Sequence, residues 1–194
     1  TKTGVTTFFL DHDIDTGRII MQKEFDIPDD ADVEYVYDGL MALGADICIE
    51  TVDAVINNDG NIPSQPQRED LPLKSAPKLF KETCLINWNK EAKQVYDFVR
   101  GLSPVPGAWC EIVHNDEKPV VMKIFRTAKT DKPLTAKDQP GDICAEGQHL
   151  LIAAADKWLE IVELQLAGKK RMMAKDFLNG YDIKGKRVFM NFVF

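Results

Sequence analysis

The chain lacks several features that would place it in a specialised class of protein. Its 194 residues contain no Cys-x-x-Cys pair, which argues against a zinc knuckle or a thioredoxin-type redox site. No uncharged apolar stretch exceeds about ten residues, so no transmembrane helix fits. The start, Thr1-Lys2-Thr3-Gly4, has neither an initiating methionine nor the apolar core of a signal peptide. These absences predict a cytoplasmic protein without a membrane partner, and a chain that is a piece of a longer one.

The cysteines are also too few and too dispersed for a disulfide framework. Cys48, Cys84, Cys110 and Cys144 are spread over the whole chain, and we expect four reduced thiols. Apolar residues make up 44% and charged residues 28% of the sequence. This composition excludes wholesale disorder and is typical of a globular protein.

The net charge of -7 is unevenly distributed. Residues 1–84 carry 7 basic and 17 acidic residues, whereas residues 85–194 carry 17 basic and 14 acidic residues. The split predicts that the second half is the part suited to an anionic partner. A slight positive balance is weak evidence for nucleic acid, because clustering of the charges matters more than their total.

The first half predicts a hairpin followed by helices. Residues 4–10 and 18–27 are rich in β-branched and aromatic residues, and a short acidic loop joins them. Acidic residues at Asp29-Asp30 suit a helix start, and helical spacing then continues to residue 56 with Gly44 as a break, which predicts two helices. Four prolines between residues 61 and 83 indicate a linker. We therefore predict domains at residues 1–60 and 85–194, with a linker at 61–84.

The second half predicts one helix and a small barrel. A helix capped by Asn89 runs to about Gly101, and five short strands follow at residues 108–114, 119–129, 142–146, 149–155 and 157–164. Turns are expected at residues 115–117 and 155–156, a short helix at 174–178 and a last strand at 187–192. Five strands of similar spacing favour a barrel of the OB type. Together with the helices expected in both halves, this barrel makes the expected fold class α+β. Trp109 and Trp158 fall in strand patterns and are expected in the core.

The densest acidic cluster allows three interpretations. Asp11, Asp13 and Asp15 surround His12 and are typical of a solvated turn. Alternating aspartates also occur in calcium loops, but the required glycine and glutamate at the sixth and twelfth loop positions are missing. In the third interpretation, neighbouring carboxylates raise the pKa of one aspartate and fit it for proton transfer. The residue pattern alone leaves these alternatives open.

Several motifs, in order along the chain, resemble one enzyme family. Gly4-Val5-Thr6-Thr7 followed by Asp15-Thr16-Gly17 resembles the signature of the 10-formyltetrahydrofolate-dependent formyltransferases. The second half resembles the C-terminal domain of the members that act on methionyl-tRNA, in Ile86-Asn87-Trp88, in residues 100–109 (RGLSPVPGAW), in Pro140-Gly141-Asp142-Ile143 and in residues 164–172 (LQLAGKKRM). The resemblance implies that residues 1–60 are the C-terminal remnant, two strands and two helices, of an α/β catalytic domain.

This resemblance implies roles for the acidic loop. The family's active site contains an Asn, a His and an Asp, and Asp15 matches the Asp. The Asn and His lie upstream in the family, so we expect this chain to lack them and to be inactive alone. His12 matches no catalytic position. The donor implied is 10-formyltetrahydrofolate, with no metal, and the loop residues implied to line its pterin pocket are Asp11, Asp13, Ile14 and Asp15.

The implied acceptor is the amine of methionine on initiator tRNA. Basic clusters in the second half fit such a partner, and OB-type barrels carry a positive groove. The candidate tRNA-binding residues are Lys123, Arg126, Lys169, Lys170, Arg171 and Lys175. Lys129 and Lys132 extend the group of Lys123 and Arg126, and Lys184, Lys186 and Arg187 form a further basic group.

Two alternative functions stay open: a formyltransferase for a sugar nucleotide or another amine, and a non-catalytic RNA-binding module. Apolar faces of the remnant predict self-association.

Overall fold

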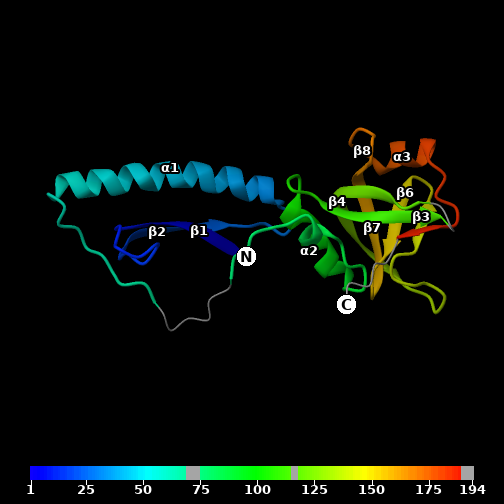
Figure 1. The fold of residues 1–194 in the computed structure, drawn as a ribbon, viewed down its shortest axis with the longest axis horizontal. Helices are drawn as coiled ribbons and strands as arrows, with labels where there is room; N and C mark the ends of the chain where they lie inside the picture. Colours follow the sequence, from blue (N-terminus) through cyan, green and yellow to red (C-terminus); the bar gives the residue numbers. More distant parts are fainter. Residues whose placement is uncertain (69–74, 115–117, 189–194) are drawn as a thin grey trace. The chain divides into compact units, whose positions relative to one another are not determined.

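The computed structural model describes residues 1–68, 75–114 and 118–188. The chain divides into two compact units, Thr1–Pro77 and Lys78–Phe194 (Figure 1). Within the described ranges, none of the helices has the length and apolar character that crossing a bilayer requires. The cysteines are free thiols, as expected.

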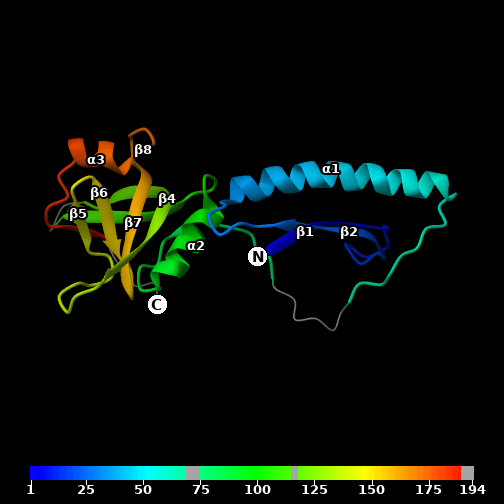
Figure 2. The same cartoon turned by 180° about the vertical axis from the view of Figure 1, so that it is seen from behind.

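The first unit is a two-stranded hairpin with one helix along it (Figures 1 and 2). β1 (Lys2–Phe8) and β2 (Ile19–Asp26) pair antiparallel, which confirms the predicted hairpin. The helix packs against the strands through Tyr35, whose ring centroid lies 5.6 Å from that of Phe25. A hydrogen bond of 2.9 Å between the hydroxyls of Thr7 and Thr51 adds a polar contact.

That helix, α1 (Val33–Asn57), is a single element of 25 residues, so the prediction of two helices is wrong. It begins later than expected because Asp32 is the N-cap and accepts a hydrogen bond of 3.0 Å from the backbone N–H of Tyr35. Gly44 does not interrupt the helix, since glycine keeps its backbone donor and costs only about 1 kcal/mol relative to alanine. The hydrogen bonds of the neighbouring turns carry the helix through this position.

Part of the proline-rich segment lies along the hairpin. Gln65 forms an antiparallel bridge with Ile19, with N–O distances of 2.8 and 2.9 Å. Arg18 donates hydrogen bonds to the hydroxyl of Ser64 at 2.9 Å and to its carbonyl at 2.5 Å. Residues 64 and 65 therefore hold this segment against the start of β2. The domain limits at 60/61 and 84/85 stay predictions.

The second unit is a mixed α/β fold around an antiparallel sheet. Its elements are η1 (Glu82–Cys84), α2 (Ala92–Leu102), β3 (Ala108–His114), β4 (Val120–Pro133), β5 (Ile143–Glu146), β6 (His149–Ala153), β7 (Lys157–Leu166), β8 (Met172–Met173), α3 (Ala174–Gly180) and β9 (Lys186–Val188). The strands expected between residues 108 and 164 and the short helix are confirmed, with β4 longer than expected. The expected turn at 115–117 and residues 189–192 of the last strand lie outside the described residues.

The sheet curls until its two edge strands approach each other. The strand order is β5-β6-β7-β4-β3-β9, with β8 beside β7. The backbone N–H of Val188 on β9 donates to the carbonyl of Gly141, just before β5, at 2.7 Å, and Asp142 forms a bridge with Arg187. The described sheet is therefore nearly closed, like a barrel. Its assignment to the OB type stays a prediction.

The core of this unit lies between α2 and the inner face of the sheet. Trp88 is fully buried there beside Val95 and Val99 of α2. Helix α2 does not begin at Asn89, as predicted, but has Glu91 as its N-cap. Glu91 and Gln94 form a local capping box, and the carboxylate of Asp156, in the turn between β6 and β7, also accepts a hydrogen bond of 2.7 Å from the backbone N–H of Ala92.

Candidate functional site

The loop between β1 and β2 brings a predicted set of residues together at the surface. His12 donates its backbone N–H to the carboxylate of Asp11 at 2.7 Å, and Thr16 donates its hydroxyl to the carbonyl of Asp13 at 3.1 Å. Ile14 is 90% exposed. The loop thus holds all four of the residues predicted to line a pterin pocket, which are Asp11, Asp13, Ile14 and Asp15.

Asp15 has an unusual backbone conformation. Its φ of 59° lies in the left-handed region, which few residues other than glycine adopt. Two residues further on, a Cβ at Gly17 would lie 1.5 Å from the carbonyl oxygen of Phe9, so no side chain fits there. The exposed carboxylate of Asp15 can accept a proton, but orientation of two reactants needs further groups around it.

One residue that contacts this loop was missed by sequence reasoning. The amide nitrogen Nε2 of Gln67 donates to the carbonyl of Asp15 at 2.7 Å and to that of Gly17 at 2.9 Å. Gln67 belongs to the segment predicted as a linker, 52 residues after Asp15. In the sequence, Gln67 is one of several polar residues in a proline-rich segment. Its residue type alone therefore could not identify it as a contact of the loop.

The arrangement of acidic side chains bears on the calcium-loop interpretation. In the parts of the chain that the structure describes, no group of three or more His, Cys, Asp or Glu residues is arranged to hold an ion. The calcium-loop interpretation of the alternating aspartates therefore gains no support from the geometry.

The basic candidates of the second unit gather partly around one carboxylate. Glu163 on β7 accepts hydrogen bonds from Nε and Nη2 of Arg171 at 2.8 and 2.7 Å, and this pairing lowers the pKa of Glu163. Arg126 on β4 is the register partner of Glu163, and its charge lowers the pKa further. The guanidinium of Arg171 also lies 4.3 Å from the ring centroid of Phe125. Arg126 and Arg171 are thus brought together, but around an acidic residue.

The lysine candidates are on β4, in the turn before β8 and in α3. Lys123 on β4 pairs in register with Gln165 on β7, and Gln165 donates its side-chain amide to the carbonyl of Lys169 at 2.8 Å. Lys169 and Lys170 are exposed in the turn before β8. Lys175 is exposed near the start of α3. Gln165 thus contacts the 169–171 turn, whereas the ammonium of Lys123 donates a hydrogen bond of 3.3 Å to the carbonyl of Pro106.

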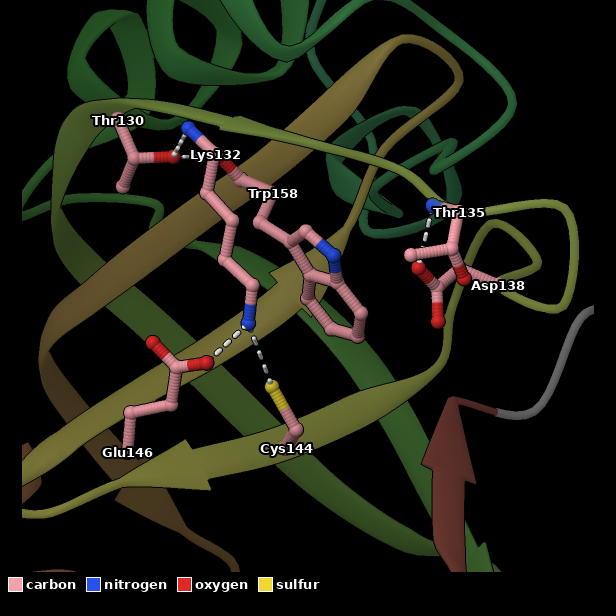
Figure 3. Close-up of polar contacts among 7 residues, drawn as sticks. All are labelled: Thr130, Lys132, Thr135, Asp138, Cys144, Glu146 and Trp158. Atoms are coloured by element: carbon pink, nitrogen blue, oxygen red, sulfur yellow. Dashed lines mark hydrogen bonds and ion pairs between the residues drawn. The ribbon is translucent and has the colours of Figure 1, made fainter.

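The two further lysines of β4 point elsewhere. The ammonium of Lys129 lies 4.6 Å from the ring centroid of Tyr96 on α2. Lys132 forms an ion pair with Glu146, lies 3.8 Å from the sulfur of Cys144 and sits 4.8 Å from the ring centroid of Trp158 (Figure 3). The grouping of the four β4 cations as one basic cluster stays a prediction, and the ion pair with Glu146 offsets the charge of Lys132 within it.

The surroundings of Lys132 form a depression of about 460 Å³ next to Trp158. The hydrogen bond with Glu146 raises the pKa of Lys132, and burial raises the pKa of the Cys144 thiol. The amine is thus held protonated and the thiol neutral, so neither group is a nucleophile at neutral pH. On the opposite wall, Asp138 accepts a hydrogen bond of 2.7 Å from the backbone N–H of Thr135 (Figure 3).

The two strand tryptophans differ in exposure. Trp158 is 4% exposed, as expected for a core residue. Trp109 is half-buried against the core, donates its indole N–H to the carbonyl of Lys81 at 2.8 Å, and has the Lys81 ammonium 5.4 Å from its ring centroid. Lys81 therefore covers one side of the indole.

Comparison with known sequences gives a consistent result. Residues 78–182 match the family described as "Formyl transferase, C-terminal domain". The methionyl-tRNA formyltransferase of Bacteroides fragilis is 46% identical over 187 residues, which are 94% of this chain and 56% of that protein. The one of Phocaeicola vulgatus is 48% identical over 186 residues, 93% of this chain and 56% of that protein. The chain thus spans little more than half the length of these relatives.

Solved structures with a similar fold are more distant in sequence. HypX from Aquifex aeolicus, in complex with tetrahydrofolic acid, superposes with a TM-score of 0.61 at 19% identity, over 95% of this chain and 31% of that one. An N-formyltransferase from Helicobacter canadensis, in complex with folinic acid and dTDP-3-aminofucose, gives a TM-score of 0.52 at 18% identity, over 88% and 56% of the two chains. At such identities the likeness shows the fold alone.

Proposed function

We propose, on the premise that this chain belongs to the formyl transferase family, that it is the C-terminal part of a methionyl-tRNA formyltransferase. The observation that carries the proposal is the 46% identity to a protein of that name, which extends over 94% of this chain and so includes both units. The donor would be 10-formyltetrahydrofolate and the acceptor the amine of initiator methionyl-tRNA. Because translation initiation occurs in the cytoplasm, the proposal places the protein there.

In this proposal the first unit contributes part of the donor site. The exposed loop offers backbone amide groups and the carboxylates of Asp11 and Asp13, which suit the hydrogen-bonding edge of a pterin. Asp15, held at the end of that loop, is the proposed catalytic carboxylate and would take part in moving the proton that the attacking amine loses. Activity would also require upstream Asn and His residues supplied by the rest of the enzyme.

The second unit would bind the tRNA as an OB-like barrel. Lys123, Arg126 and the 169–171 turn share one region of the β4–β7 surface, and clustered cations bind RNA by displacing its counterions. The proposed contacts are Lys123, Arg126, Lys169, Lys170, Arg171 and Lys175. Such contacts position the RNA and do not read its bases, so discrimination among tRNAs would come from other groups.

A chimera tests the proposal directly. The part of the B. fragilis relative that precedes the matched region is joined to this chain, and formyl transfer to methionyl-tRNA is measured. We expect activity in the chimera, its loss in the Asp15→Asn variant, and none in the 194-residue chain alone. Transfer to a dTDP-amino sugar instead of methionyl-tRNA would support the sugar-nucleotide alternative. An inactive chimera that binds tRNA would support the non-catalytic RNA-binding module.

A further inference from the structure

Residues 64–67, here termed the strap, contact the C-terminal side of the proposed catalytic loop, where it leads into β2. Gln65 exchanges two backbone hydrogen bonds with Ile19, and Ser64 accepts two from the side chain of Arg18. Gln67 reaches further into the loop and donates its amide nitrogen to Asp15 and Gly17. These contacts come from two independent kinds of group, backbone at Gln65 and side chain at Gln67.

The Gln67 contact acts on the backbone that carries Asp15. One amide nitrogen binds the carbonyls of Asp15 and Gly17, which are the acceptors on either side of Thr16. Tying two carbonyls to one donor fixes the peptide planes between them. Asp15 has a φ of 59°, which aspartate tolerates better than most residues but at a cost relative to glycine. Hydrogen bonds from outside the loop to its backbone favour this conformation over the extended ones.

We propose that Gln67 is a positioning residue, which holds Asp15 in its left-handed conformation and thereby sets the direction of the Asp15 carboxylate. The proposal rests on the function proposed above for Asp15. Gln67 itself does not touch the reacting atoms: its donor faces the loop backbone. Within the segment predicted as a linker, the proposed role falls on Gln67 alone, which acts on the reaction only through Asp15.

The chimera described above provides the kinetic test. Gln67→Met keeps the length of the side chain but removes its donor, and we expect kcat to fall roughly tenfold, as the loss of about one to two neutral hydrogen bonds allows. The KM for methionyl-tRNA should not change, because the proposed tRNA contacts are all in the other unit. Gln67→Lys restores an N–H donor at similar reach and should recover most of the rate. Gln65→Ala is the matched control, since the hydrogen bonds of Gln65 to Ile19 come from its backbone, and it should match wild type.

A second measurement on the 194-residue chain does not depend on activity. Backbone ¹⁵N order parameters of Asp15, Thr16 and Gly17 should be near the rigid value of about 0.85 in the wild type and fall toward about 0.6 in Gln67→Met. If the wild-type chimera is inactive, the proposed function fails while this measurement still tests the strap. If the chimera is active but Gln67→Met matches Gln65→Ala in rate and in order parameters, the positioning role is overturned.

Discussion

Arg171 donates two hydrogen bonds to Glu163, so one of the cations proposed to bind tRNA is already paired with a carboxylate. Glu163 lies opposite Arg126 as well and therefore offsets part of the charge that an RNA backbone would meet. The acidic residue limits the affinity of this surface for phosphate. An RNA strand that binds here must compete with Glu163 for Arg171.

Glu163→Gln should therefore bind initiator tRNA more tightly than the wild type. Each basic side chain that becomes free to contact a phosphate should make the slope of log affinity against log salt concentration more negative by roughly 0.7 to 0.9. Fluorescence anisotropy between roughly 50 and 200 mM salt measures both quantities. Glu111→Gln, which makes the same change of charge on β3, is the control. Equal effects of the two substitutions would mean that only net charge matters and that the pairing is irrelevant.

Two glycines of α1 should respond to alanine in opposite directions. A Cβ at Gly44 meets nothing within 4 Å, so Gly44→Ala should stabilise the first unit by up to about 1 kcal/mol through helix propensity. A Cβ at Gly39 would lie 2.1 Å from the Phe25 ring, so Gly39→Ala should destabilise the same unit. Denaturant unfolding followed by helix circular dichroism tests both. Destabilisation by Gly44→Ala would contradict the continuous helix.

His149 should stabilise the second unit mainly at low pH. Its Nδ1 lies 2.7 Å from a carboxylate oxygen of Glu160, and this hydrogen bond raises the pKa of His149 above 6.5. The stabilisation is therefore complete below about pH 6.5 and is lost as the pH rises through the raised value. Comparing the wild type with Glu160→Gln at mildly acidic and mildly alkaline pH should show the larger difference in unfolding temperature at acidic pH. An NMR titration that gives His149 an ordinary pKa would refute the argument.

The exposed side of α1 should cause self-association of the 194-residue chain. Tyr37, Met41, Ile49, Val52 and Ile56 are each at least 50% exposed and follow helical spacing. Because exposed apolar stripes bind other apolar surfaces, sedimentation equilibrium should show association that grows with concentration. The triple variant with lysine at positions 41, 49 and 56 should be monomeric and still helical. A wild-type chain that stays monomeric at high concentration would count against this prediction.

The sequence predicted what depends on local pattern. β-Branched and aromatic residues predicted β1 and β2, short strands between turns predicted β3 to β7, and the family resemblance singled out Asp11, Asp13, Ile14 and Asp15. The break at Gly44 was wrong, because propensity alone does not say whether the turns on both sides keep their hydrogen bonds. The pairing of Arg171 with Glu163 depends on the turn between β7 and β8, and the contact of Gln67 with Asp15 joins residues 52 positions apart. Neither follows from local composition.

The hydrogen bond between Asp156 and the first turn of α2 has a consequence for folding order. The carboxylate that satisfies the Ala92 N–H lies 64 residues further along the chain, in the turn that joins β6 to β7. During folding, α2 gains this stabilisation of its positive end only after that strand pair has formed and closed a long loop. The local capping box of α2 needs no such closure, but we expect this one contact of the helix to form late, with the non-local pairing that slows the folding of β-rich domains.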